Sequence, residues 1–205
     1  MLTLYYAKGS SALAPHILLE EVGAQYAVHE VPIAKGAHQE PEYLEINPKA
    51  RVPALMTPDG LITENPAILT YIADTHPRAE MFPDTPFARA EANALCAYLC
   101  GTVHVAFAHL QRGARWADSA EAQGAMKAKV VSNLQACARI IEDRHMKSPW
   151  ALGDQFSLCD PYLFLVPRWM AKAGADLSEF PKLAAHHDAM LKRPAVLTVM
   201  AVHGL

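Results

Sequence analysis

Hydrophobic positions follow a strand-like pattern in the first third of the chain and a helix-like pattern after it. In the first third, short apolar or alternating runs are bounded by turn residues, which is typical of strands. Between the first two runs, residues 12–22 have helical character and are closed by Gly23. A second helix is predicted from Pro66 to about Thr75, and a polar loop from Pro32 to Glu42. The predicted strands are Leu2–Tyr6, Tyr26–Val31, Val52–Met56 and Leu61-Ile62.

The rest of the chain carries only helical signals. Pro167 falls inside one predicted helix and is expected to kink it near Trp169. Residues 77–86 are rich in proline, as expected of a linker. We therefore predict an α/β domain at 1–77, a linker at 78–86 and an all-helical domain at 87–205. Predicted helices are Thr85 to about Gln111, Ser119 to about His145, a third that begins at Ser157, and two shorter ones after Pro181 and Pro194.

Composition and charge exclude several classes of function. The 205 residues have a net charge of −3, and Lys and Arg form no basic stripe, so nucleic acid is not an expected partner. No apolar run is long enough to span a bilayer, and no signal peptide is visible, so a cytoplasmic protein is expected. Cys96 and Cys100 share a helix face, but they read better as small buried hydrophobes than as half of a metal site. No metal is expected.

Four segments in order carry a family resemblance. They are KGSSALAPH (8–16), NPKARVPAL (47–55), TENPAILTYI (63–72) and GDQFSLCD (153–160). Together they resemble the glutathione transferase superfamily over essentially the whole chain, and the first is closest to the bacterial beta class. The resemblance implies a thioredoxin-like N-terminal domain, an all-helical C-terminal domain, glutathione as co-substrate and a homodimer. The last segment reads as a capping box, in which the Asp160 side chain reaches back to the Ser157 amide.

Glutathione is a short peptide, and two of these segments suit it. The family pattern implies a cis Val52-Pro53 bond, which would turn the Val52 backbone outward to pair with an extended peptide. Asn65 is a good N-cap before Pro66, and the helix start would attract the γ-glutamyl carboxylate, with Glu64 on the amino group. The family more often has Ser where Asn65 stands. Further candidate glutathione-binding residues are Lys35 and Arg51 for the glycyl carboxylate, and His104.

The chemistry of this family requires glutathione as a thiolate, because the thiolate is the nucleophile. A hydroxyl that donates to the sulfur lowers the thiol pKa. Ser11 is the first candidate, Ser10 the second and Tyr6 the third, with Tyr5 as a further hydroxyl at the same strand end. The beta class usually has Cys at the position of Ser11, so exchange through a protein disulfide is disfavoured here. Both serines could instead merely cap the helix.

Three functions remain open at this point. The first is transfer of glutathione to a small hydrophobic electrophile. The second is a glutathione-dependent isomerase or reductase reaction, and the third is a glutathione-binding scaffold without catalysis. The electrophile pocket is expected between the domains, beside His104. Its expected lining residues are Tyr6, Phe107, Tyr162 and Trp169.

Overall fold

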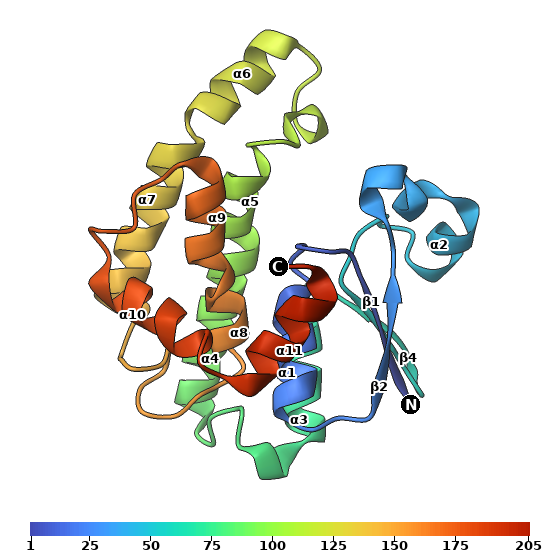
Figure 1. Cartoon of the computed structure of the whole chain (residues 1–205), viewed down its shortest axis with the longest axis vertical. Helices are drawn as coiled ribbons and strands as arrows, with labels where there is room; N and C mark the ends of the chain where they lie inside the picture. The colour runs from blue at the N-terminus through green and yellow to red at the C-terminus, as the bar shows by residue number, and fades with distance from the viewer. The chain divides into compact units, whose positions relative to one another are not determined.

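The computed structural model describes residues 1–205 and divides into two compact units. The first unit contains residues 1–89 together with 191–205, and the second contains residues 90–190. These packing units differ from the predicted division at 78–86, because the last helix of the chain groups with the N-terminal residues. The predicted fold class is confirmed: a mixed sheet with helices comes first, and a helical region follows (Figure 1).

A four-stranded sheet organises the first unit, in the order β2-β1-β3-β4. Strands β1 and β2 run parallel, whereas β3 is antiparallel to both β1 and β4. Alternation along β1 places Leu4 and Tyr6 in the core and leaves Tyr5 half-buried on the other face. The strands are β1 Leu2–Tyr6, β2 Tyr26–Glu30, β3 Ala54–Thr57 and β4 Gly60–Thr63.

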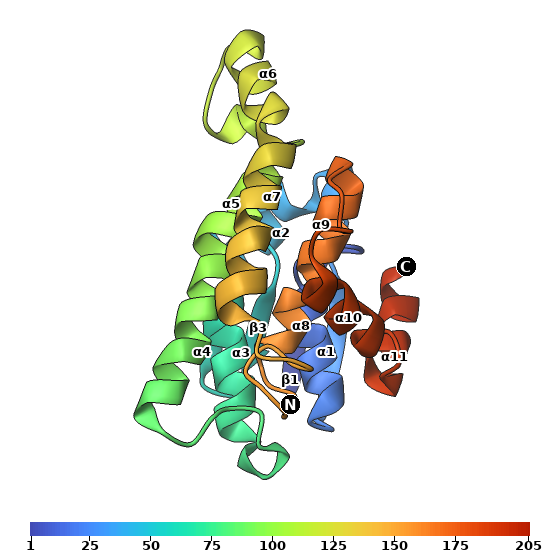
Figure 2. The same ribbon diagram turned by 90° about the vertical axis from the view of Figure 1, so that its left-hand side faces the viewer.

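Helices α1, α3 and α11 of this unit pack together, since α1 contacts both of the others (Figure 2). Helix α2 was not predicted, and it lies where the polar loop was expected to end. It has only six residues, one of them buried, so it shows little of the apolar spacing that identifies longer helices. The helices are α1 Leu13–Glu21, α2 Pro41–Ile46, α3 Asn65–Thr75 and α11 Pro194–His203.

The second unit is entirely helical apart from one isolated bridge. Helix α4 begins in the first unit, and the Thr85 hydroxyl caps it by accepting from the Ala88 amide at 3.2 Å. Ser119 caps α6 in the same way, accepting from the Ala122 amide at 3.2 Å. Both predicted caps are therefore confirmed. The helices are α4 Pro86–Tyr98, α5 His104–Ala108, α6 Ala120–Ala128, α7 Val130–Ile140, α8 Asp160–Leu163, α9 Leu165–Ala173 and α10 Pro181–Met190, with π-helical turns at Leu99–Val103 and Ile141–His145.

Two long helices differ from the prediction. The helix expected from Ser119 to His145 is interrupted at Lys129, between α6 and α7. The kink expected near Trp169 was wrong: the break is at Phe164, between α8 and α9. Pro167 therefore lies in the first turn of α9, where its missing N–H removes no hydrogen bond from the interior of a helix.

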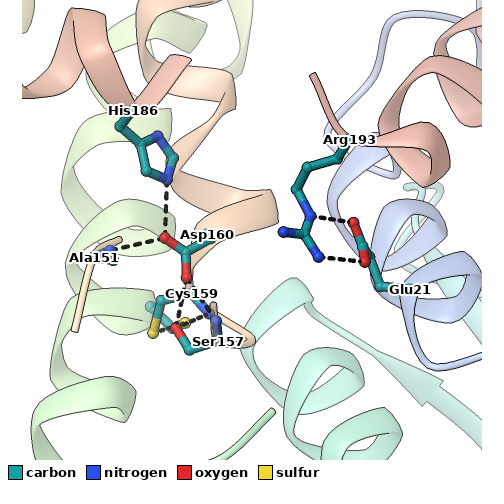
Figure 3. Close-up of polar contacts among 8 residues, drawn as sticks. Glu21, Ala151, Ser157, Cys159, Asp160, His186 and Arg193 are labelled. Atoms are coloured by element: carbon teal, nitrogen blue, oxygen red, sulfur yellow. Dashed lines mark hydrogen bonds and ion pairs between the residues drawn. The ribbon is translucent and has the colours of Figure 1, made fainter. Parts of the chain in front are cut away.

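The predicted capping box at the start of α8 is confirmed, and it is larger than expected (Figure 3). The Ser157 amide and hydroxyl donate to Asp160 Oδ2 at 2.7 and 2.8 Å. The other oxygen, Oδ1, accepts from the Ala151 amide at 2.8 Å and from His186 Nε2 at 2.9 Å. Asp160 and His186 are fully buried, so this carboxylate fixes three separate segments of the second unit.

Candidate functional site

Three of the segments singled out in the sequence meet at one end of the sheet. Tyr5 pairs with Ala54 across β1 and β3, and Ala54 pairs with Thr63 across β3 and β4. The end of β1, the start of β3 and the end of β4 are therefore neighbours. Val52-Pro53 directly precede β3, Glu64-Asn65 directly follow β4, and Ser10-Ser11 lie in the loop that leaves β1, so the register directs all three pairs to the same end of the sheet.

The loop from β1 to α1 uses its two serines differently. The Ser10 amide donates to the Ala7 carbonyl at 3.1 Å. The Ser10 hydroxyl oxygen accepts from the amides of Ala7 and Ala12 at 3.4 and 3.3 Å. Ser11 is buried, with 7% of its surface exposed, and its hydroxyl has no hydrogen bond within the chain. Ser10 therefore closes the loop, whereas the Ser11 hydroxyl remains available at the start of α1.

Tyr6 ends β1 on the buried face of the sheet. Its ring lies 4.8 Å from the His203 ring and 5.8 Å from the His16 ring, measured between centroids. Burial raises the pKa of Tyr6, and the negative charge of Glu30 adds to the effect. The Tyr6 hydroxyl therefore stays protonated at neutral pH and can act only as a neutral hydrogen-bond donor.

The Val52-Pro53 bond is cis, as the family pattern implied. The loop before it is held through the Arg51 carbonyl, which accepts from the Tyr43 hydroxyl and from Asn47 Nδ2, each at 2.7 Å. Asn47 is 1% exposed, and its Oδ1 also accepts from the Lys49 amide at 3.2 Å. Sequence analysis assigned no role to Asn47 or Tyr43. Asn47 is the first residue of the segment 47–55, so the family resemblance was the one signal that could have identified it.

The start of α3 corrects one prediction. Asn65 is not the N-cap: Glu64 holds that position with a φ of 74°, and Asn65 is the first helical residue. Asn65 is 4% exposed, and its Oδ1 has no hydrogen-bond partner. The Glu64 carboxylate accepts from Lys49 Nζ at 2.7 Å, and the same ammonium donates to Thr63 Oγ1 at 2.9 Å. Lys49 was missing from the predicted site.

The two basic candidates for the glycyl carboxylate have exposed side chains. Lys35 ends the 3-10 turn Ile33–Lys35, which follows β2. Arg51 is exposed next to the Val52-Pro53 bond, and only its backbone carbonyl is fixed. Neither side chain is placed against another predicted site residue.

The candidates in the second unit form an aromatic cluster of their own. The rings of His104 and Phe107, both from α5, stack on Trp169 of α9 at centroid distances of 4.7 and 5.4 Å. Tyr162 meets Trp169 edge-on at 6.3 Å. His104 and Phe107 are half-buried, whereas Tyr162 is fully buried. Only the two half-buried rings have surface that a ligand could contact within this unit.

Other kinds of site are not found. No group of three or more His, Cys, Asp or Glu side chains is arranged to hold a metal ion. All four cysteines are free thiols, and Cys96 Sγ lies 3.7 Å from Cys159 Sγ in the core of the second unit. No helix has the length and apolar character that crossing a membrane requires.

Curated proteins similar to this chain cover its full length. The profile of the family "Glutathione S-transferase, N-terminal domain" matches residues 1–74. Glutathione S-transferase GstA of Escherichia coli O157:H7 is 31% identical over 206 residues, covering 98% of each chain. Maleylacetoacetate isomerase of Pseudomonas aeruginosa is 28% identical over 200 residues, covering 93% of this chain and 91% of the isomerase.

Solved structures agree with these relatives. A glutathione transferase homologue from Sulfitobacter, crystallised with bound glutathione, is 39% identical and superimposes with a TM-score of 0.97, covering 100% of this chain and 99% of that chain. The bacterial beta class glutathione S-transferase of Sphingomonas chungbukensis is 33% identical with a TM-score of 0.81, covering 99% of both chains. The similarity therefore extends over both compact units.

Proposed function

The chain belongs to the glutathione S-transferase family, and from this premise we propose that it transfers glutathione, as the thiolate, to a small hydrophobic electrophile. The observation that supports the proposal is the convergence of Ser10-Ser11, Val52-Pro53 and Glu64-Asn65 at one end of the sheet. The serine hydroxyls suit a thiol, and the Val52 backbone suits an extended peptide. The start of α3 suits a carboxylate.

Glutathione would bind through this edge. The Val52 backbone would pair with the peptide as an added strand, which gives main-chain hydrogen bonds without side-chain selectivity. The α-carboxylate of the γ-glutamyl group would sit at the start of α3, where free N–H groups are found. The unpartnered Asn65 Oδ1 is an acceptor, so it suits a donor of the ligand rather than the carboxylate. Glu64 would receive the amino group. Lys35 and Arg51 would face the glycyl carboxylate, and His104 completes the set of proposed binding residues.

The thiol would be activated by a neutral hydroxyl rather than by a protein cysteine. A free thiol has a pKa of about 8.5, so most of it is protonated at neutral pH. The Ser11 hydroxyl, which has no partner within the chain, is the first candidate to donate to the sulfur, followed by Ser10 and Tyr6. The nearby N-terminus of α1 adds a favourable dipole. Serine has no adjacent base here, so we do not assign it a nucleophilic role.

The electrophile would contact aromatic side chains. We propose that the half-buried Phe107 contacts the electrophile, with Trp169 stacked on Phe107 and the buried Tyr162 packed edge-on against Trp169. Tyr6 stays a predicted contact. A hydrophobic lining would favour small apolar electrophiles over charged ones.

The thiolate absorbance of bound glutathione, followed against pH, tests the proposal. Ser11→Ala should raise the pKa of the bound thiol and slow conjugation to a chloronitroaromatic electrophile. Alanine variants of Ser10 and Tyr6 rank the three hydroxyls. If only Tyr6→Ala moves the titration, Ser11 is the wrong donor. If none moves it, glutathione is bound without activation, and a non-catalytic scaffold becomes the better account.

A glutathione-dependent isomerase is the second candidate. Two observations favour it, namely the adjacent hydroxyls of Ser10 and Ser11 and the similarity to a maleylacetoacetate isomerase. The absence of an arginine-rich segment after the serines counts against it. Turnover of maleylacetoacetate with glutathione, without net consumption of the thiol, would distinguish isomerisation from conjugation.

We also propose a homodimer. The proposal follows from the family resemblance, and Phe87, which leaves 75% of its surface exposed in the first turn of α4, is a candidate contact residue. Light scattering at micromolar concentration should give twice the mass of the chain. A monomer mass would contradict the proposal, and Phe87→Ser in a dimeric wild type should weaken the association.

A further inference from the structure

Helix α11 comes last in the sequence and packs along α1 in the first unit. Its start is fixed by a two-point ion pair between Arg193 and Glu21, with Nη2 and Oε2 2.7 Å apart (Figure 3). Its end is fixed by His203, whose Nε2 lies 3.1 Å from His16 Nδ1. Both histidines are about 98% buried, with 1% and 2% of their surfaces exposed. The helix is thus attached to α1 at both ends.

The end of α11 also touches the strand that leads into the serine loop. The His203 ring is the nearer of the two imidazoles to Tyr6, at 4.8 Å between centroids. Tyr6 is the last residue of β1, and the loop with Ser10 and Ser11 begins immediately after it. His203 therefore packs on Tyr6, directly before the serine loop. Tyr6 is itself one of the three candidate donors to the glutathione sulfur.

A second contact from the same helix end reaches the loop. Gly204 adopts a left-handed conformation with a φ of 68°, which only glycine takes without strain, and turns the chain after α11. The Leu205 amide then donates to the Met200 carbonyl at 3.0 Å. This turn places Leu205 Cδ2 3.9 Å from where a β-carbon of Gly9 would be. Leu205 thus lies against the residue that precedes Ser10.

We propose that the end of α11 is a positioning element of the thiol site, in which His203 fixes Tyr6 and Leu205 fixes the loop that carries Ser10 and Ser11. The inference rests on the proposed function, since it concerns the same sulfur-binding hydroxyls. Neither residue contacts the sulfur in this account. Each acts through a neighbour, and what it contributes is the placement of a hydroxyl that must lie within hydrogen-bond distance of the thiol.

The contact between the histidines is suited to a fixed role. A single hydrogen bond between two imidazoles needs one N–H donor and one bare nitrogen, so the pair must carry no more than one proton between the facing nitrogens. Burial lowers the pKa of His16 to about 4, against a smaller opposing effect of Glu20. The pair therefore persists across the neutral pH range in which conjugation would be measured.

A merely structural role makes a different prediction from a positioning role. The Arg193–Glu21 ion pair docks the same helix on α1, but at the opposite end of α11 from His203 and Leu205. Loosening α11 at that end lowers stability without moving the loop directly. Variants at the two ends of α11, matched for loss of stability, therefore separate docking of the helix from placement of the hydroxyls.

The experiment compares full-length His203→Leu, His203→Gln, Leu205→Ala and Glu21→Ala, with Ser11→Ala as reference. For each, kcat and KM with glutathione and a chloronitroaromatic electrophile are measured together with the pH titration of the bound thiolate. His203→Leu should lower kcat by about 10-fold or more, within the ~10²-fold that a misplacement of about 1 Å can cost. KM for glutathione should stay unchanged, and the pKa of the bound thiol should rise.

The other three variants are controls for the effect of His203→Leu on kcat. Glutamine can place a polar atom near the position of His203 Nε2, so His203→Gln should recover most of kcat. Leu205 is 47% exposed, so Leu205→Ala should fold normally and reduce kcat less than His203→Leu does. Glu21→Ala should lower the melting temperature but leave kcat and the thiol titration at their wild-type values.

Three results overturn the inference. If Ser11→Ala raises the thiol pKa while His203→Leu and Leu205→Ala do not, α11 has no positioning role, and the proposed function still stands. If Glu21→Ala lowers kcat as much as a His203 variant of equal stability, the effect is general loosening. If no variant, Ser11→Ala included, changes the titration of bound glutathione, the proposed function fails and the inference fails with it.

Discussion

The starts of α8 and α3, one in each unit, treat their buried polar groups in opposite ways. At α8, Asp160 accepts four hydrogen bonds from Ser157, Ala151 and His186, so both carboxylate oxygens are occupied. At α3, no side chain caps the helix, and the nearly buried Asn65 leaves its Oδ1 without a partner. The start of α8 thus occupies both oxygens of its buried carboxylate, whereas the start of α3 leaves a buried amide oxygen open.

This difference indicates that the start of α8 serves folding and that the start of α3 serves binding. An unpaired buried acceptor costs roughly 1–3 kcal/mol, so it persists only where something else compensates for it. A ligand group that donates a hydrogen bond to Asn65 Oδ1, such as an ammonium or an amide N–H, would supply that compensation in the first unit. A carboxylate whose two oxygens are both occupied, as in Asp160, has no free acceptor for a ligand and contributes to stability.

Removal of Asp160 should give the largest effect. Asp160→Ala leaves two backbone amides, a hydroxyl and an imidazole without their acceptor, which should lower the free energy of unfolding by at least about 3 kcal/mol. Urea denaturation at pH 7 measures the change. Ser157→Ala, which removes only one of the four bonds, is the matched control and should cost less. Equal losses for the two variants would show that the network does not act as a unit.

Acid should weaken the first unit through its buried imidazole pair, His16 and His203. Burial lowers the pKa of His16 from 6.5 to about 4, so the unfolded chain takes up this proton first as the pH falls. Stability should therefore decline between pH 6.5 and about 4, by up to about 3 kcal/mol. His16→Asn does not titrate in this range, so its denaturation midpoint should fall less steeply from pH 7 to 4.5. Parallel slopes would contradict the assignment.

Changes at the open helix start should affect binding rather than stability. Glu64→Ala should weaken glutathione binding by about 1.5–3 kcal/mol in calorimetry, because charge-assisted hydrogen bonds have about that value. Its ion pair with Lys49 is exposed, and such pairs contribute only about 0–1 kcal/mol to folding. Asn65→Ala should likewise reduce affinity while changing the free energy of unfolding by less than about 1 kcal/mol. An Asn65→Ala variant that unfolds like Asp160→Ala would abolish the distinction.

Ser10 and Ser11 show the same contrast between a hydroxyl that is hydrogen-bonded within the chain and one that is not, with the smallest expected effects. Ser10→Ala removes an acceptor for the Ala7 and Ala12 amides and should cost about 1 kcal/mol of stability. Ser11→Ala removes no hydrogen bond of the chain and should leave the melting temperature nearly unchanged while altering the thiol titration. Thermal unfolding without glutathione checks the first expectation, and a larger loss for Ser11→Ala than for Ser10→Ala would reverse the assignment.

Most of the fold could be predicted because its signals are local. Strand alternation at Leu2–Tyr6, the caps at Thr85 and Ser119, and the capping box at Ser157 each depend on residues within a few positions of one another. The break at Phe164 was misplaced because a proline in a helical pattern can fall either within a helix or in its first turn. Sequence spacing alone does not separate these two positions.

The candidate site was less predictable because it depends on partners that are distant in sequence. Lys49 bridges Thr63 and Glu64, and Asn47 holds the Arg51 carbonyl, yet neither contact has a periodicity that reveals it. Asn65 looked like an N-cap by residue type, but the positive φ of Glu64 shifts the helix start by one residue. The grouping of α11 with the first unit was also hidden, since an apolar helix does not specify its packing partner.

The first unit is closed by residues that are far apart in the sequence, and this has a consequence for the order of folding. His16 and His203, which contact each other in this unit, are 187 residues apart. During synthesis the sheet, α1 and α3 emerge first, but the face of α1 that α11 covers stays open until residues 194–203 have left the ribosome. The helical unit, residues 90–190, can complete its own core before that moment. The first unit thus completes its core only after the helical unit has been synthesised. Until then, the apolar face of α1 that α11 covers is exposed, and a chaperone would bind there.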